Sequence, residues 1–344
     1  MKKFPSRPVP GRRSGLVAIA CAALLGLAGG VAEPAQAQAT STGSVQAWPG
    51  KPVRLIVPFP AGAAPDVIAR LVADRLGTSW GHAVFVENRP GAGGIPGMAA
   101  LTRSPADGYT LGFVPAAVIT LTPELYKNPQ FNIDTDLVPV AAIGTSPMMV
   151  VVNQSSEIKT LSDLVRTSKA QPGKVNFAAA QSNSVPHLTG EMLGRVTGAP
   201  FFTVPYSGSA AATTALLANE AAVTVDGLPA LTQYVKAGKL RALAVTSKER
   251  LPGFESVPAA GETVPGFESI GWFSIYAPTG TPAAIVEQVN RDINKVIQQP
   301  DLVVRFAELG VYPKPGSPKA LADFVREQRS AWKKVVTDLG LQPQ

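Results

Sequence analysis

The chain has 344 residues, of which 45% are hydrophobic and 16% charged, and its formal net charge is +7. This length and composition are those of a globular protein with room for two domains of ordinary size. The basic residues form no Lys/Arg-rich run interleaved with aromatic residues, which argues against nucleic acid as a partner.

The first 39 residues have the pattern of a secretory signal peptide. Basic residues precede an apolar run from Leu16 to Val31, and alanines in the stretch 35–39 offer two overlapping cleavage sites. The run contains several glycines and is too short for a comfortable membrane span of about 20 residues. We therefore predict export to the periplasm, by the general secretory route or, given the pair Arg12-Arg13, by the twin-arginine route.

Removal of residues 1–39 changes the charge and the cysteine content of the chain. The leader carries five Lys and Arg residues and one Glu, so the formal charge falls from +7 to +3, and about 305 residues remain. The single cysteine, Cys21, lies in the leader, so the mature chain has no disulfide and no thiolate site. Only a few apolar residues precede Cys21, which argues against a lipid anchor there.

Beyond the leader, short β-branched runs alternate with helical patterns, as expected of a mainly parallel α/β architecture. A first strand at 53–57 is followed by apolar residues at helical spacing, at Ile68, Leu71, Val72 and Leu76. Further strands are predicted, in chain order, at 84–86, 111–114, 149–152, 175–178, 221–225 and 240–245.

Two well-marked helices close the chain. Thr281 as N-cap and Pro282 in the first turn predict the start of one helix. Ser317-Pro318 predicts the start of the second, and Gly340 its end. We find no internal repeat and no low-complexity linker. Two domains without a linker indicate that the chain crosses between them more than once, as in hinged binding proteins.

The sequence carries no recognisable catalytic constellation. The G-x-S-x-G elbow and the Walker loop are absent, and the two histidines, His82 and His187, lie in no recognised motif. The glycine-rich segment 91–97 fails as a dinucleotide loop because Pro96, at the third motif glycine, has no amide hydrogen. No spacing suits a metal, and nothing in the sequence pairs the carboxylates for acid-base work. We therefore expect no cofactor, no metal and no enzymatic activity.

A series of motifs resembles the Bug-type extracytoplasmic solute-binding proteins of tripartite tricarboxylate transporters. The motifs run in order over essentially the whole mature chain: the stretch from Trp48-Pro49 to Pro60, VENRPGAGG at 86–94, DGYTL at 107–111, HLTGE at 187–191, VPYSGS at 204–209, GKLRALAV at 238–245, APTGTP at 277–282, and Trp332. The resemblance implies a type II periplasmic-binding-protein fold, two α/β lobes with a ligand cleft and a hinge between them. Lobe 1 would comprise residues 46–146 plus 270–344, and lobe 2 residues 147–269.

The resemblance also implies a function. The protein would capture a small organic carboxylate in the periplasm and deliver it to the membrane subunits of a tripartite tricarboxylate-type transporter. The ligand could be a di- or tricarboxylate, an aromatic carboxylate or an acidic amino acid. In this family, loops from both lobes hold the carboxylate through backbone amides, hydroxyls and bridging waters, with little reliance on an arginine clamp. We expect a monomer whose lobes close on the ligand.

Two other classes of function remain open. One is a ligand-sensing protein that docks to a membrane sensor kinase. The other is an enzyme on the same scaffold, with His187 as the candidate base. A large membrane protein encoded beside this chain would favour transport, and a neighbouring sensor kinase would favour signalling.

The predicted ligand site lies where strands give way to helices, because a helix start presents unpaired amides and a partial positive charge to an anion. The first loop links the first strand to the first helix, and its small residues let a ligand approach the backbone. Its predicted ligand-binding residues are Phe59, Ala61, Gly62, Ala63, Ala64 and Asp66. Asp66 has a second interpretation, as a helix cap that can also hold an ordered water, since like charge argues against direct contact with a carboxylate.

The facing loop precedes the helix that carries His187, and its hydroxyls and amides are suitable donors. Its predicted residues are Ala180, Gln181, Ser182, Asn183 and Ser184. The alternative is an ordinary capping loop. We expect Ser184→Ala to weaken binding while barely changing the stability of the unliganded fold.

Later loops would complete the second lobe's contribution. The predicted residues are Tyr206, Ser207 and Asp226. His187 is interpreted as structural rather than liganding, because it lies inside the helix start. Trp272 and Phe273 either pack in the core or hinge or line the pocket.

The two loops depart from the family pattern. The family's first loop reads proline, two or three glycines, threonine and aspartate, whereas here methyl groups and a proline occupy residues 61–65 before Asp66. The second loop is also poorer in glycine. A different ligand or a different water arrangement is therefore expected, and the sequence does not name the carboxylate.

Overall fold

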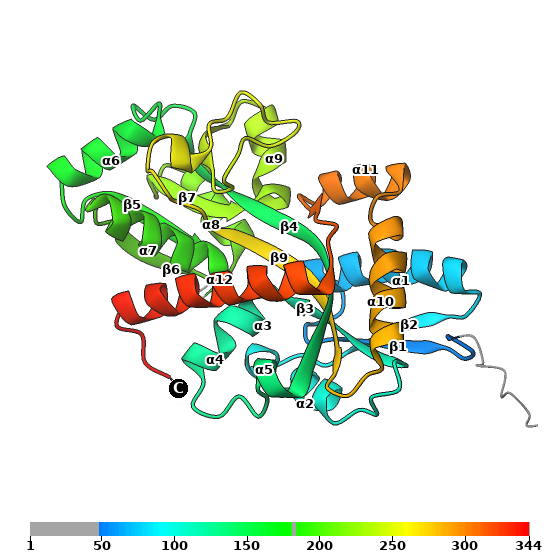
Figure 1. The fold of residues 1–344 in the computed structure, drawn as a ribbon. Helices are drawn as coiled ribbons and strands as arrows, with labels where there is room; N and C mark the ends of the chain where they lie inside the picture. Colours follow the sequence, from blue (N-terminus) through cyan, green and yellow to red (C-terminus); the bar gives the residue numbers. More distant parts are fainter. Residues whose placement is uncertain (1–47, 181–183, 344) are drawn as a thin grey trace, which may run out of the picture. The chain divides into compact units, whose positions relative to one another are not determined.

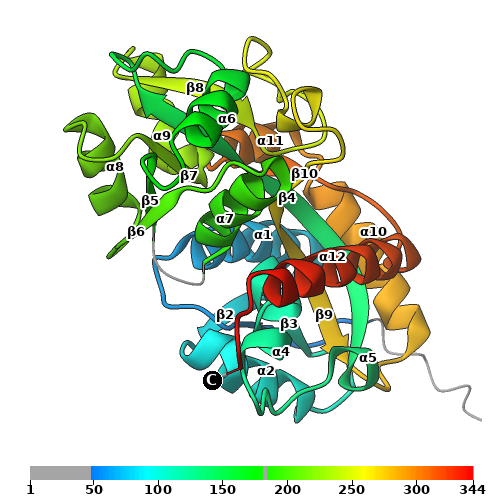
Figure 2. The same cartoon turned by 90° about the vertical axis from the view of Figure 1, so that its left-hand side faces the viewer.

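A computed structural model of the chain describes residues 48–180 and 184–343, and Figures 1 and 2 show it in two orientations. The predicted leader, residues 1–39, lies outside these ranges. Within them, no helix combines the length and the hydropathy needed to span a membrane.

The strands of the described residues join into one hydrogen-bonded sheet. Their bounds are β1 (Val53–Val57), β2 (Val84–Asn88), β3 (Thr110–Pro115), β4 (Leu137–Asn153), β5 (Asn176–Ala180), β6 (Phe202–Tyr206), β7 (Val223–Gly227), β8 (Leu240–Val245), β9 (Ile270–Pro278) and β10 (Tyr312–Pro313).

The sheet contains two parallel strand sets joined by two antiparallel strands. Its order is β2-β1-β3-β9-β4-β7-β5-β6, and β8 and β10 pair with β4 outside this path. β1 pairs in parallel with β2 and β3, and β5 pairs in parallel with β6 and β7. The 17-residue strand β4 is antiparallel to β9 from Leu137 to Pro147 and antiparallel to β7 and β8 from Met148 onward. The expectation of a mainly parallel sheet therefore holds for each set and not for the strands that join them.

The helices connect and cover these strands (Figure 1). Their bounds are α1 (Ala64–Trp80), η1 (Ala92–Gly94), α2 (Ile95–Thr102), α3 (Ala116–Thr120), α4 (Thr122–Leu125), α5 (Ile133–Asp136), α6 (Leu161–Ala170), α7 (Val185–Thr197), α8 (Ser209–Leu217), α9 (Leu228–Lys236), η2 (Ala260–Glu262), α10 (Ala283–Val296), α11 (Pro300–Glu308) and α12 (Pro318–Asp338).

The predicted helix starts near the C-terminus are right in one case and wrong by one residue in the other. Ser317 caps α12 by accepting a hydrogen bond from the amide of Ala320 at 3.1 Å, and Gly340 adopts the left-handed φ of +67° that ends the helix. α10 begins at Ala283, after Pro282 as N-cap. The Thr281 hydroxyl donates to the carbonyl of Pro278 at 2.7 Å, so it does not cap the helix.

The sequence prediction missed β6, β9 and the first part of β4. Proline and glycine interrupt these strands, which weakens a strand signal. β4 contains Pro139 and Gly144, and its pairing with β9 shifts register just after Pro139 and just before Gly144. β6 contains Pro205, which is tolerated because β6 lies at the edge of the sheet.

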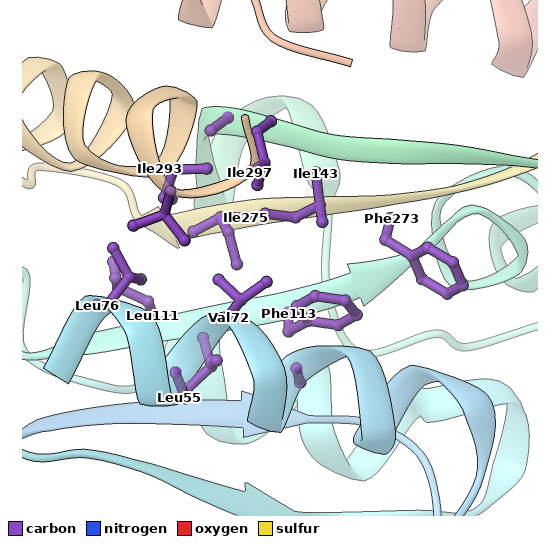
Figure 3. Close-up of a cluster of buried hydrophobic side chains, with 14 of the residues drawn as sticks. Leu55, Val72, Leu76, Leu111, Phe113, Ile143, Phe273, Ile275, Ile293 and Ile297 are labelled. Atoms are coloured by element: carbon purple, nitrogen blue, oxygen red, sulfur yellow. The ribbon is translucent and has the colours of Figure 1, made fainter. Parts of the chain in front are cut away.

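Each strand set has its own buried apolar clusters. The largest cluster of the first set packs β1, β3 and β9 against α1 and α10, and Figure 3 shows ten of its labelled side chains between these elements. Phe113 and Phe273 stack there at 5.6 Å between ring centroids. Trp272 and Phe273 are 2% and 8% exposed, so both belong to the core rather than to a pocket wall.

The predicted lobe boundaries fall at two positions in the strands that join the sets. β4 leaves β9 after Pro147, and β9 begins at Ile270. Clusters of the second set draw their buried members from residues 148–267. The division into lobes 46–146 plus 270–344 and 147–269, with a hinge between them, stays a prediction.

Gly190 in α7 allows the helix to lie against β5. A Cβ at Gly190 would overlap the ring of Phe177, whereas a Cβ at Gly77 in α1 would meet only ordinary contacts at 3.4 Å. Gly190→Ala should lower the free energy of unfolding by about 1–3 kcal/mol because the ring must move. Gly77→Ala should raise it by about 0.5–1 kcal/mol, since alanine is the better helix former. Urea unfolding of both variants measures this, and equal effects would contradict the packing shown at Gly190.

Candidate functional site

A cavity of about 540 Å³ brings together loops from both strand sets. Its lining includes residues 58–60 after β1, the glycine turn 91–94 after β2 and residues 184–186 after β5. Side chains of α3 and α4, which follow β3, complete it. Ligands of α/β proteins bind outside the carboxyl ends of parallel strands, so this cavity is the candidate ligand site.

A larger and more open cavity of about 790 Å³ lies between α6 and the C-terminal end of α7. Arg166, Lys169 and Val196 are among the residues that line it. Loops at the carboxyl ends of the parallel strands do not contribute to it, so its larger size does not make it the better candidate.

The first predicted loop leads from β1 into α1. Phe59 lines the cavity, whereas the lining given by the described residues does not include Ala61, Gly62, Ala63, Ala64 or Asp66. Gly62 has a φ of +81°, a left-handed conformation that favours glycine. The first intrahelical bond runs from Val67 to Ala63, and Pro65 has no amide hydrogen, so the first turn can offer a ligand the amides of Ala64 and Asp66.

The carboxylate of Asp66 holds this loop in place. It is 2% exposed and accepts hydrogen bonds from the Gly62 amide at 2.8 Å, from Arg70 Nε at 3.0 Å and from Asn88 Nδ2 at 2.8 Å. Asn88 also donates to the carbonyl of Phe59, and Arg70 donates to Asn88. The N-cap itself is Ala63, so Asp66 secures the helix start by binding the residue before the cap. Direct ligand contact by Asp66 stays a prediction.

These contacts set the charge state of Asp66. Burial alone would raise the pKa of the carboxyl, but the hydrogen bonds from Arg70, Gly62 and Asn88 outweigh it and hold the pKa below its ordinary value. Asp66 is therefore an anion already neutralised by Arg70, which leaves this arginine committed to the fold.

The second predicted loop ends at Ser184, the N-cap of α7. Its Oγ accepts a hydrogen bond from the amide of His187 at 3.3 Å and donates to the carbonyl of Ala180 at 3.2 Å. The expectation that Ser184→Ala would barely change the unliganded fold is therefore wrong, because loss of a serine N-cap costs about 1 kcal/mol. Ser184 also lines the cavity, so capping and binding are compatible. Gln181, Ser182 and Asn183 lie outside the described residues.

His187 belongs to a contact between α7 and β6. Its Nε2 lies 3.7 Å from Glu191 Oε1, and Glu191 also accepts a hydrogen bond from the Thr203 hydroxyl. The hydrogen bond from His187 is the main cause that holds the pKa of Glu191 below its ordinary value. This pairing agrees with the structural interpretation of His187.

Tyr206, Ser207 and Asp226 lie at the same edge of the second strand set as Ala180. Tyr206 ends β6 opposite Ala180, and Asp226 lies at the end of β7. None of the three is part of the cavity lining that the described residues give.

The carboxylate of Asp226 is buried. Asp226 is 6% exposed, its Oδ1 accepts a hydrogen bond from the Gly227 amide at 2.7 Å, and its Oδ2 has no hydrogen-bond partner among the described residues. Burial raises the pKa of this carboxyl, and the nearby Ser209 hydroxyl and the Gly227 amide offset only part of the rise. A role of Tyr206, Ser207 and Asp226 in ligand binding stays a prediction.

The site prediction overlooked the glycine turn 91–94 and the α3–α4 segment. Gly93 and Gly94 have φ of +64° and +89°, and the Thr122 hydroxyl donates to the carbonyl of Gly93 at 2.7 Å. The turn that follows β2 is therefore bound to the first residue of α4. Since 111–114 was a predicted strand, the rule that ligands bind at carboxyl ends of parallel strands could have pointed to the segment that follows it.

The comparison with protein families gives the class of the chain. Residues 68–341 match the tripartite tricarboxylate transporter family receptor, TctC. The chain belongs to this family. It is a family of solute-binding receptors and not of enzymes, in agreement with the sequence interpretation. Among residues 48–180 and 184–343, no group of three or more His, Cys, Asp or Glu side chains is placed to hold a metal ion.

Three solved structures show the same fold. Rpa4515 of R. palustris, solved with adipate, is 32% identical, has a TM-score of 0.73, and the match covers 86% of this chain and 100% of that one. The periplasmic binding protein BugD is 30% identical with a TM-score of 0.69 over 86% of this chain and 100% of its own. MatC of Rhodopseudomonas palustris, solved with bound malate, is 28% identical with a TM-score of 0.68 over 84% and 100%. The predicted periplasmic-binding-protein fold and the Bug-type resemblance are thereby confirmed.

The Asp66 network makes the stability of the protein depend on pH in a defined direction. A lowered folded pKa stabilises the fold above the unfolded pKa of about 3.9, and this stabilisation is lost as the pH falls through the folded pKa. Asp66→Asn should cost about 1–3 kcal/mol at pH 7, and its difference from wild type should shrink below about pH 4.

Urea unfolding of both proteins between pH 3 and pH 7 measures this dependence. Asp74→Asn is a matched control, because Asp74 lies on the same helix with its side chain 70% exposed, and it should change stability by less than about 0.5 kcal/mol. A cost of Asp66→Asn that stays constant across this range would show that the Asp66 charge is not what holds the loop.

Proposed function

We propose that this protein captures a small organic carboxylate in the periplasm and delivers it to the membrane subunits of a tripartite tricarboxylate-type transporter. The family to which the chain belongs supports this role, as do relatives solved with adipate and with malate. The predicted signal peptide at 1–39 and the likeness to the periplasmic protein BugD support the compartment.

The observation that carries the proposal is the position of the cavity at the start of α7. It lies between loops from both strand sets, and the start of α7 forms one of its borders. The 13-residue helix α7 has Pro186 in its first turn and the His187 amide bound to Ser184, which leaves the Val185 amide for a ligand. A carboxylate placed there meets the positive end of the α7 dipole.

Contact from both strand sets also supports hinge closure. Only a conformation in which both sets contact the ligand gains the full binding energy, so the ligand shifts the population toward that conformation. The chain crosses between the sets within β4 and before β9, and such element ends are where closure can be absorbed. The membrane subunits would then recognise the closed, loaded form.

A thermal-shift screen of the purified mature protein tests binding. The screen uses a panel of aliphatic and aromatic mono-, di- and tricarboxylates together with acidic amino acids. We expect at least one acid to raise the apparent free energy of unfolding by about 2.7 kcal/mol when its concentration is one hundred times its dissociation constant. The primary amide of the same compound is the matched control and should give no shift, since it has the same size and no charge.

Failure of every acid to shift the unfolding temperature would contradict the proposal, and so would an equal shift by an acid and its amide. Delivery is tested separately by uptake of the labelled acid in cells that lack this protein. If cells that lack this protein take up submicromolar acid as fast as wild-type cells, the protein binds the acid without a role in its transport. That result would favour the sensing alternative.

A further inference from the structure

One side of the candidate cavity is built from apolar side chains. Phe59 lies in the loop after β1, Val118 in α3, and Leu121, Leu125 and Tyr126 in α4 and its two flanking positions. We refer to these five residues as the apolar wall. Apolar side chains dominate ligand sites in general, and here they share the cavity with the start of α7, where the Val185 amide is left for a ligand.

The apolar wall is held rigidly from behind. Leu121 and Leu125 are 3% and 8% exposed and pack in one cluster with Leu188 of α7 and with Trp332 and Val336 of α12. Figures 1 and 2 show α12 running beside α7, where this cluster forms. A wall backed by a buried cluster keeps its shape when the cavity is empty, and a preformed surface binds a ligand without an ordering cost.

The glycine turn fixes the wall from the other side. A Cβ at Gly93 would lie 2.7 Å from Tyr126 Cε2, and a Cβ at Gly94 would lie 2.9 Å from Val118 Cγ2. The backbone of the turn therefore contacts the Tyr126 ring and the Val118 side chain directly. Any larger residue at these positions would displace the wall, so the turn determines where the wall stands.

Two of the three polar side chains in the described lining, those of Thr122 and Ser184, have partners inside the protein, and the third is Tyr126. The Thr122 hydroxyl donates to the carbonyl of Gly93 at 2.7 Å, and the Ser184 hydroxyl donates to the carbonyl of Ala180 at 3.2 Å. Among the described residues that line the cavity there is no Lys, Arg or His. A charged or hydroxylated group placed against the apolar wall would therefore lose its hydration without gaining a cation, and the single hydroxyl of Tyr126 would replace only one of its hydrogen bonds to water.

We propose that the site is specific for carboxylates whose body is an unsubstituted hydrocarbon, either a medium-length aliphatic chain or an aromatic ring, that lies against the apolar wall. This inference rests on the proposed function and narrows its ligand class. It excludes small hydroxylated polycarboxylates such as citrate and malate as the preferred ligands, because their polar groups would meet the wall.

A series of straight-chain carboxylates tests the proposal directly. Butanoate, hexanoate and octanoate have the same carboxylate and differ by two methylene groups at each step. Full burial of a methylene strengthens binding about fourfold, so partial burial against the wall should give about two- to fourfold per methylene. Calorimetric titration should then show that octanoate binds at least tenfold more tightly than butanoate, and that citrate and malate bind more weakly than hexanoate.

Two variants at Tyr126 connect this dependence to the wall. Tyr126→Ala should weaken octanoate binding at least tenfold and reduce the gain per methylene, while it changes butanoate binding by less than about threefold. Tyr126→Phe keeps the ring and should leave all affinities within about twofold of wild type. Thermal unfolding of each variant shows that it remains folded.

The outcomes separate this proposal from the proposed function. Tight binding of citrate or malate together with equal affinities for butanoate and octanoate would overturn the hydrocarbon preference and leave carboxylate binding intact. A chain-length dependence that Tyr126→Ala leaves unchanged would also overturn it, because the wall would not be its cause. Absence of binding by every carboxylate would overturn both.

Discussion

One strand, β4, connects the two strand sets, and the rest of the fold depends on it. Its 17 residues exceed the length that either set can pair, so it binds β9 over its first part and β7 and β8 over its second part. The backbone amides and carbonyls of a buried strand need hydrogen-bond partners. β9 supplies these partners for the first part of β4, and β7 and β8 supply them for the second part. The two sets are consequently joined by a paired strand rather than by a flexible linker. Their loops at the strand ends can meet in one cavity for this reason.

Side chains secure the starts of α1 and α7. Asp66 binds the loop before α1, and Ser184 caps α7. Each helix has a proline in its first turn, Pro65 in α1 and Pro186 in α7. Proline has no amide hydrogen, so it leaves no donor unpaired there, and its fixed φ suits the start of a helix. In the proposed function, neutral donors would hold the anion, because the arginine near the first loop, Arg70, is paired with Asp66. Under this proposal, affinity would depend strongly on the body of the ligand, since the charged group would meet similar donors in every carboxylate.

Much of the fold could be predicted from the sequence, and the failures have physical causes. β1 and β8 were predicted with their observed bounds because no proline or glycine interrupts their apolar residues. β9 was missed because its aromatic and small residues alternate without a β-branched run, and β4 was predicted only over its uninterrupted end at 149–152. The start of α10 was misplaced by one residue because the Thr281 hydroxyl bonds to Pro278 instead of the helix, a choice that depends on the preceding turn.

The candidate site was only partly predictable. Phe59 and Ser184 were predicted and line the cavity, because each lies where a strand ends. Gly93, Thr122 and Tyr126 were not predicted, since their role depends on contacts between segments far apart in the chain. Asp226 was predicted for the ligand and is found buried at the end of β7, outside the described lining of the cavity. Patterns along the chain locate strand ends, but only the packing of α3 and α4 decides which of those ends meet.

Hydrogen exchange with and without a saturating carboxylate tests the central claim most directly. That claim is that one ligand is held between loops from both strand sets. We expect slower exchange in peptides that cover residues 59–66 and in peptides that cover 184–190, with smaller changes in α6 and α11. Protection confined to one of the two loops, or protection centred on the cavity beside α6, would contradict the account.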